Sequence, residues 1–214
     1  MVKVFIAGAS APGTYPISEL PSRIRVGAGE SIDIVAIVLP GASCEMPLTV
    51  DIDGEGAEVN LSGLYICGSE EKVTFDLNVH HNAGGTVSRQ LFNGIAGGSS
   101  RAAFHGRIVV RQDSQKIKAF QENHNILLSE DARIETMPQL EIYADDVECS
   151  HGATTGFLNA EEQFYMRSRG IPEAEAKVMQ AISFLSPVVA RIDDEELRGT
   201  VAALVEDAVR SLSF

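Results

Sequence analysis

Tryptophan is absent from the sequence, and its three cysteines, Cys44, Cys67 and Cys149, lie far apart. An odd and sparse set of cysteines does not form the disulfide framework of a small secreted protein. The sequence also lacks a CxxC pair, so the thiols of this chain alone do not make a typical zinc or iron–sulfur site. Any metal held here is therefore expected to need histidine or carboxylate ligands, or ligands from a second chain.

Long apolar runs are missing as well. No stretch reaches the roughly 20 apolar residues that a membrane-spanning helix requires. The apolar stretch at residues 4–9 is too short for a secretory signal and is followed at once by Pro12 and Gly13. We therefore expect a cytoplasmic protein with no membrane partner.

Positive charge is scarce, because 17 Lys and Arg residues face 30 Asp and Glu residues, for a net charge of −13 over 214 residues. Such a surface repels phosphate backbones and anionic lipid, which argues against a nucleic-acid partner. The phosphate-binding motif GxxxxGK[ST], the GxSxG elbow and the HExxH helix are all absent. Hydrophobic residues make up 44% of the chain, enough for a substantial core. The expectation is a folded, non-enzymatic protein.

The composition changes near residue 156. Gly, Asn, Ser, Thr and β-branched residues dominate before it, and Ala, Glu, Leu, Met and Arg dominate after it, which predicts strands followed by helices. We therefore expect a β domain at residues 1–156 and a helical domain at residues 157–214. Short strand-like runs separated by Gly, Asn, Asp or Ser occur at residues 48–52, 59–61, 73–79, 108–110 and 139–143.

Two architectures fit many short strands: an antiparallel sandwich or barrel, and a β-helix of stacked coils. An antiparallel sandwich or barrel needs tight hairpin turns, and the only candidates for such turns are Asp53–Gly54 and Asn93–Gly94. The asparagines Asn78, Asn82, Asn123 and Asn125 suit the corners of coils, because asparagine tolerates left-handed backbone. These features favour the β-helix, although no exact repeat is visible and the sandwich stays open.

The last part of the chain predicts three helices. Asn159 and Glu162 have the spacing of a capping box, so a first helix is expected to run to about Ser168 and to stop at Gly170. The other expected boundaries are Pro172 at the start of a second helix, Pro187 where it is disturbed or ends, and Asp193–Asp194 at the start of a third. Residues 141–214 hold fourteen acidic and six basic residues, which predicts either a solvated helical face or an acidic docking surface.

Four segments carry a resemblance to a known family. They are PQLEIYADDVECSHGATTG at residues 138–156, EQFYMRSRGI at residues 162–171, FHGRIVV at residues 104–110 and QKIKAFQENHNILLS at residues 115–129. In order and spacing they resemble the SufB/SufD family over residues 70–190. The ADDVECSHGAT run is most similar to SufD, an iron–sulfur cluster assembly subunit.

The resemblance implies a fold and a role. It implies a right-handed parallel β-helix followed by C-terminal helices, acting as a scaffold subunit of the SUF system. The partners that it implies are a SufC-like ABC-type ATPase, docked by the C-terminal helices, and a SufB-like paralogue or a second copy, paired through the β-helix. It implies no stably bound cofactor, but a transient iron ion or iron–sulfur cluster at a subunit interface. Typical members have a longer N-terminal region and more coils, so a short homodimeric member and a partner for a longer SufB-like subunit both remain open.

Three residues are candidate metal ligands. The resemblance implies that His151 lies at the subunit interface and helps to assemble the nascent cluster. Cys149 precedes it by two residues, so on a strand its thiol and the imidazole point the same way and can meet one metal. Aligned with the SufB block, His124 falls near an essential scaffold cysteine and could supply a further ligand. Each residue also has a purely structural interpretation. His151 can be a hydrogen-bonded histidine, Cys149 a small buried residue and His124 a polar residue at a corner of a coil.

Two other functions remain open. A secreted-type, polysaccharide-active β-helix enzyme would need carboxylates or basic residues clustered on an exposed sheet face, together with surfaces for stacking sugars. The carboxylates of Glu122 and of Asp145–Asp146 are expected mainly to be solvated or to cap turns. The other alternative is a structural member of the family that has lost cluster assembly.

Overall fold

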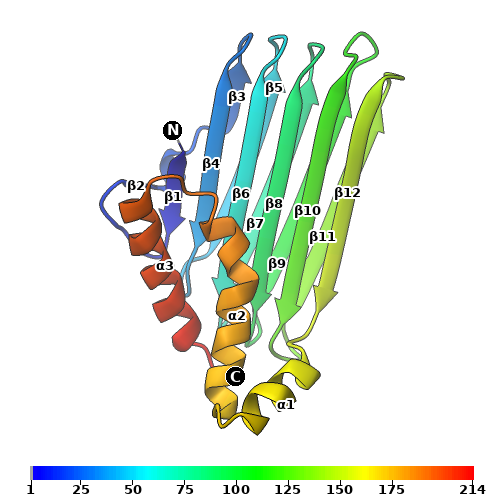
Figure 1. The fold of residues 1–214 in the computed structure, drawn as a ribbon. Helices are drawn as coiled ribbons and strands as arrows, with labels where there is room; N and C mark the ends of the chain where they lie inside the picture. Colours follow the sequence, from blue (N-terminus) through cyan, green and yellow to red (C-terminus); the bar gives the residue numbers. More distant parts are fainter. Residues whose placement is uncertain (1) are drawn as a thin grey trace.

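The computed structural model describes residues 2–214 and shows parallel strands stacked into a β-helix of about five turns (Figure 1). From β2 onward, successive strands alternate between two sheets, so each full turn of the chain adds one strand to each sheet. Every strand pairing recorded in residues 2–214 is parallel. The predicted β-helix is confirmed, and the antiparallel sandwich or barrel is wrong.

The two sheets lie face to face, and we call them sheet A and sheet B. Sheet A has the order β12-β10-β8-β6-β4-β1-β2, with β1 (Lys3–Ala7), β2 (Thr14–Pro16), β4 (Ser31–Val38), β6 (Glu58–Cys67), β8 (Val87–Ala96), β10 (Ile117–Leu127) and β12 (Val147–Gly156). Sheet B has the order β11-β9-β7-β5-β3, with β3 (Arg23–Val26), β5 (Cys44–Ile52), β7 (Lys72–His81), β9 (Arg101–Val110) and β11 (Arg133–Ile142). A short 3-10 helix, η1 (Ile17–Glu19), precedes β3.

The interior between the sheets is filled by alternate residues of each strand. In β7, for example, every second side chain from Val73 to His81 is buried, while the residues between them are partly exposed. Four aromatic rings form a column through this interior: Tyr65, Phe75, Phe92 and Phe104, with neighbouring ring centroids 6.2, 5.4 and 5.1 Å apart. Such offset and edge-to-face contacts add to the stability gained by burial.

The turn and corner assignments made from the sequence need correction. Asn93–Gly94 is no hairpin turn, because both residues lie inside β8. Three of the predicted corner asparagines also lie within strands: Asn78 in β7, and Asn123 and Asn125 in β10. Only Asn82 follows directly after a strand. The physical reason is that stacked coils satisfy polar side chains internally; the Asn123 amide, for example, donates to the Phe92 carbonyl at 3.1 Å.

The three predicted helices are present as α1 (Ala160–Ser168), α2 (Glu173–Val189) and α3 (Glu195–Arg210). The side chain of Asn159 accepts from the backbone N–H groups of Glu161 and Glu162, and Gly170 follows α1 with a φ of +88°. Pro187 lies in the last turn of α2, and the Asp194 side chain caps α3 by accepting from the Leu197 N–H.

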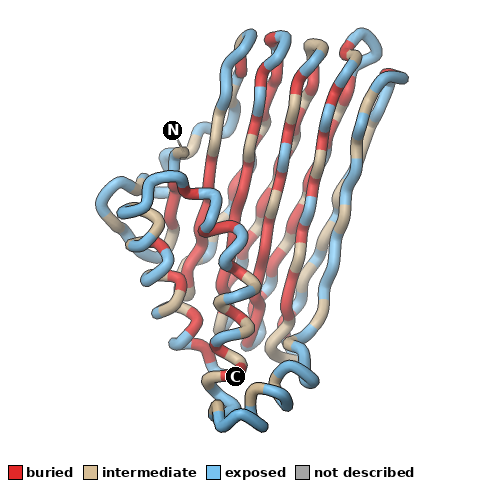
Figure 2. Tube along the Cα trace, viewed as in Figure 1, coloured by how far each residue is buried: buried red, intermediate tan, exposed pale blue. Residues whose placement is uncertain are grey.

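Helices α2 and α3 fold back over the outer face of sheet A (Figures 1 and 2). They share one buried cluster with it, in which Val178, Leu185 and Val205 of the helices join Leu64 and Ile95 of the sheet. Strand β12 ends four residues before α1 begins, close to the boundary expected at residue 156. A separate helical domain at residues 157–214 stays a prediction. The buried cluster that these residues share with sheet A holds them against the sheet. In residues 2–214 no helix is both long and apolar enough to cross a membrane.

Candidate functional site

The last coil of the β-helix is open. Strand β12 pairs only with β10, and β11 pairs only with β9, so each leaves one edge of its backbone without a neighbouring strand in residues 2–214. The last coil is correspondingly exposed: β11 and β12 carry only exposed and half-buried residues, whereas β8 and β10 contain many buried ones (Figure 2). An unpaired strand edge is a surface that another chain can extend by backbone hydrogen bonding.

Cys149 and His151 lie on this last strand and face the same way. Cys149 pairs in register with Ala119, and His151 pairs with Gln121, and both partners point into the interior of the β-helix. Cys149 is half-buried and His151 is exposed, because no further coil covers them. The structure therefore brings a thiol and an imidazole together at the open end of the interior, on the same face of one strand.

Burial raises the pKa of the Cys149 thiol, an effect opposed by a hydrogen bond from the Ala119 backbone and reinforced by the nearby Glu148 carboxylate. The thiol is therefore protonated at neutral pH. Because a metal binds the thiolate, loading this residue with iron would release a proton.

A column of buried amides leads from the interior to this site. Gln90, Gln121 and His151 occupy one register row on β8, β10 and β12. The Gln121 Nε2 donates to the Gln90 Oε1 at 2.9 Å, and Gln121 is fully buried. Its Oε1 has no hydrogen-bond partner in residues 2–214, so the row carries an unsatisfied acceptor beside the strand of His151. Gly106 makes room for this amide, because a side chain there would overlap it.

Sequence reasoning missed Gln90 and Gln121. They lie about thirty residues apart along the chain, and the coil period of about thirty residues is the only signal that aligns them with His151. The period varies from coil to coil, so the sequence alone does not reveal it.

His124 lies on the opposite face of sheet A. Its Nδ1 is 2.9 Å from the Thr154 Oγ1 on the outside of β12, and its Nε2 is 3.8 Å from the Glu122 Oε2. Residues on β10 alternate between inside and outside, so His124 and Gln121 point in opposite directions. The structure thus does not bring His124 together with Cys149 and His151.

The acidic pair Asp145–Asp146 lies in the corner before β12. The Asp146 carbonyl accepts from the Lys116 N–H at 2.6 Å, and the Asp146 N–H donates to the Gln115 Oε1 at 2.8 Å. These backbone contacts hold the corner in place, in keeping with the turn role expected for this pair.

The family follows from a match over most of the chain. The sequence model of the family described as "SUF system FeS cluster assembly, SufBD core domain" matches residues 17–184. The chain belongs to the SufB/SufD family.

Two relatives named SufD support this assignment. The iron–sulfur cluster assembly protein SufD of Escherichia coli is 36% identical over 170 residues, which are 79% of this chain and 40% of the relative. SufD of Bacillus subtilis is 28% identical over 162 residues, 76% of this chain and 37% of the relative. A SufBD family protein of Synechocystis is 38% identical over 137 residues, 64% of this chain and 29% of the relative. The chain thus spans less than half the length of these SufB/SufD relatives and is most like SufD.

The matched core contains all three candidate ligands of this SufB/SufD chain. In residues 2–214, however, no group of three or more His, Cys, Asp or Glu side chains converges on one point in a way that could hold a metal ion. Cys149 and His151 can supply two ligands, so a cluster bound there would need the others from outside the described residues.

Proposed function

We propose that this SufD-like chain is a non-enzymatic scaffold subunit of a SUF-type iron–sulfur assembly complex, and that its open last coil is the place of assembly. The observation that carries the proposal is the position of Cys149 and His151 on a strand with an unpaired edge. Iron is bound well by both imidazole and thiolate, and a second subunit across the edge supplies the missing ligands. The iron or cluster is cargo that leaves the site. The three free cysteines suit a reducing compartment such as the cytoplasm.

The test replaces His151 by Ala in cells whose own SufD-type gene is deleted. We expect iron–sulfur enzyme activities to fall several-fold, while the amount of protein and its thermal stability stay unchanged because His151 is exposed. The matched control is His105→Ala, a partly exposed histidine on the outer face of sheet B. Equal activities in both variants would instead favour a family member that has lost cluster assembly.

The second partner in this proposal is a SufC-like ATPase, docked on the C-terminal helices. An apolar hollow of about 720 Å³ lies between α1, α2 and the end of the β-helix. It is lined by large exposed side chains, Phe157, Tyr165 and Met179, of which the first two are 73% and 61% exposed. Glu161 and Glu162 also line it and add negative charge. Exposed aromatic residues with a charged rim are typical of protein interfaces.

Calorimetry with the ATPase tests this docking. Tyr165→Ser in the full chain should weaken binding about tenfold or more, because a buried aromatic anchor typically contributes at least 1–2 kcal/mol. Tyr15→Ser removes an exposed ring on β2, at the edge of sheet A opposite β12, and should bind as the wild type does. If both variants bind equally well, the ATPase docks elsewhere.

A further inference from the structure

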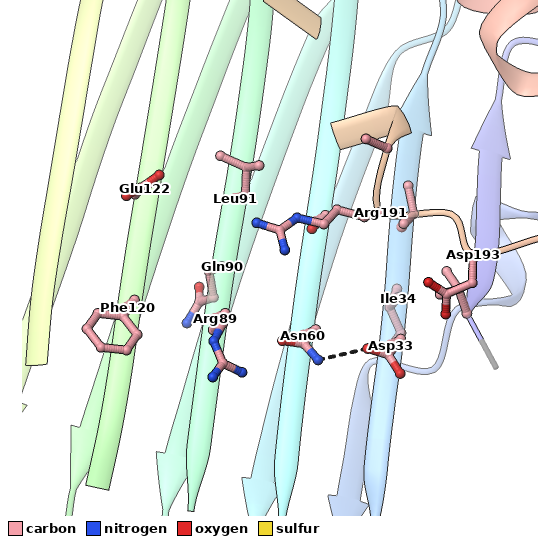
Figure 3. Close-up of a pocket in the computed structure, with 14 residues that line it drawn as sticks. Asp33, Ile34, Asn60, Arg89, Gln90, Leu91, Phe120, Glu122, Arg191 and Asp193 are labelled. Carbon is pink, nitrogen blue, oxygen red and sulfur yellow. Dashed lines mark hydrogen bonds between the residues drawn. The ribbon is translucent and has the colours of Figure 1, made fainter. Parts of the chain in front are cut away.

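A second hollow lies on the outer face of sheet A, away from the open coil. It has a volume of about 500 Å³ and is bounded by β4, β6, β8 and β10 on one side and by the segment that joins α2 to α3 on the other (Figure 3). Arg89 enters it from β8, and Arg191 enters it from the turn after α2. In Figure 3 the Arg191 guanidinium lies between β6 and β8 near Leu91, and the Arg89 guanidinium lies further along β8.

The position of Arg191 is fixed by the turn that carries it. The backbone N–H of Arg191 donates to the Val188 carbonyl at 3.1 Å. The next residue, Ile192, is fully buried, and its carbonyl accepts from the Arg198 guanidinium at 3.0 Å. The arginine therefore projects from an anchored segment and not from a free loop.

Neither guanidinium has a close carboxylate partner. Arg191 forms no ion pair with any residue in the described part of the chain, and the only one for Arg89 is Glu58, at 3.8 Å across an exposed surface. Three carboxylates also line the hollow, those of Asp33, Glu122 and Asp193, and two of them contact other groups. Asp33 accepts from the Asn60 amide at 2.8 Å, and Glu122 faces His124 at 3.8 Å. The hollow thus holds one arginine without an ion pair and one with only a long contact, in a chain whose net charge is −13.

We propose that this hollow binds a small organic anion, with Arg89 and Arg191 both directed at one phosphate or carboxylate head group. Guanidinium groups bind such oxyanions through paired, charge-assisted hydrogen bonds. The lining also offers an apolar floor for the body of the ligand, made by Phe120, Leu91 and Val35.

The charges at the two ends of the hollow limit the size of the ligand. Glu122 lies on the β10 side of the two arginines, and Asp33 and Asp193 lie on the opposite side (Figure 3). These carboxylates repel a long polyanion such as a nucleic acid, but they leave room for a single anionic group in the middle. This assignment does not depend on the proposed role in cluster assembly, because it uses the opposite face of sheet A.

The experiment titrates the purified full chain with inorganic phosphate, phenyl phosphate and benzoate at constant ionic strength. Binding is followed by the NMR signals of the arginine Nε–H groups and by the midpoint of thermal unfolding, which rises when a ligand binds the folded state. We expect saturable shifts of two arginine signals, with phenyl phosphate or benzoate binding more tightly than inorganic phosphate because of the apolar floor. The comparison of phenyl phosphate with benzoate identifies the preferred head group.

Two variants and one control decide where the anion binds. Arg89→Gln and Arg191→Gln should each weaken binding by tenfold or more, without changing the thermal stability of the free protein, since both side chains are on the surface. Arg111→Gln removes an exposed arginine outside the hollow and should bind as the wild type does. The proposal is overturned if no probe gives a saturable response, or if the two variants bind like the control.

Discussion

Cys67 is buried, whereas Cys44 and Cys149 are half-buried, and this difference affects the reactivity of the three thiols. Burial raises the pKa of Cys67 to about 12, and the nearby Glu71 carboxylate adds to the effect. Burial also raises the pKa of Cys44 and of Cys149, which are only half-buried. Since the thiolate is the reactive form, the three residues should differ in their rates of alkylation.

The first prediction concerns these rates. In the folded protein at pH 8, iodoacetamide should modify Cys44 and Cys149 more slowly than it modifies free cysteine, and should leave Cys67 unmodified, because Cys67 is fully buried. Mass spectrometry of peptides measures the three rates separately. In urea all three should react alike. Modification of Cys67 at the rate of Cys149 in the folded protein would contradict the placement of these residues.

The second prediction concerns His81, which is fully buried and within hydrogen-bond distance of the hydroxyl groups of Thr86 and Ser88, at 2.7 and 2.9 Å. Burial lowers its pKa from 6.5 to about 4. The folded state therefore keeps the neutral imidazole, while the unfolded chain takes up a proton as the pH falls below 6.5. The free energy of unfolding is therefore not reduced by this residue above pH 6.5. It falls by on the order of 3 kcal/mol as the pH decreases from 6.5 toward 4.

Urea unfolding of the wild type and of His81→Gln over this pH range measures the effect. The variant is less stable near neutral pH, but it lacks the titrating group. The difference in free energy of unfolding between the two proteins should therefore shrink from pH 7 to pH 4. A difference that stays constant with pH would mean that His81 does not remain neutral in the folded protein.

At the scale of the strands, glycine makes room for large neighbours in the interior. Tyr65, Gly94 and Asn125 occupy one register row on β6, β8 and β10. Because Gly94 has no side chain, the Tyr65 ring lies over it and its hydroxyl donates to the Asn125 Oδ1 at 2.7 Å, two strands away. One missing side chain thus lets a buried hydroxyl and a buried amide satisfy each other.

The third prediction follows from this row. A methyl group at Gly94 would overlap the Tyr65 ring, so Gly94→Ala should displace the ring, break its hydrogen bond and destabilise the fold by about 2–3 kcal/mol. The control is Gly199→Ala in α3, where a methyl group meets nothing within 4 Å. This variant should raise the free energy of unfolding by up to about 1 kcal/mol, because alanine favours a helix more than glycine does. Chemical unfolding measures the free energy of unfolding of both variants. If Gly94→Ala is as stable as Gly199→Ala, the Tyr65 ring does not lie over Gly94.

The same row shows what sequence patterns could predict and what they could not. Asn93–Gly94 has the composition of a hairpin turn, yet stacking places it inside β8, with the Asn93 amide donating to the Phe184 carbonyl of α2 at 2.7 Å. Helix boundaries were predictable because the caps at Asn159 and Asp194 are local signals. The shared face of Cys149 and His151 was predictable for the same reason, since it needs only the alternation of a strand. The Gln121 row and the separation of His124 depend on register between distant coils, which no local pattern reveals.

For the whole molecule, the decisive feature is that the β-helix ends on an open coil while its helices cover only part of sheet A (Figure 1). A stack of parallel strands protects its inner members and leaves its ends available. The proposed function uses two separate surfaces: the strand edge at β11 and β12, proposed to bind a second β-helix, and the apolar hollow at α1 and α2, proposed to bind the ATPase. These surfaces are built from different elements, so the binding of each partner can be measured separately.

We propose that the last coil, with Cys149 and His151, forms the seam between this chain and a SufB-like subunit. Hydrogen–deuterium exchange of the full chain, measured alone and with that subunit, tests this position of the seam. Residues 147–156 should exchange quickly in the free chain and become strongly protected in the complex, while the interior strand at residues 72–81 stays slow in both. A complex that forms without any change in the exchange of residues 147–156 would show that the subunit binds elsewhere.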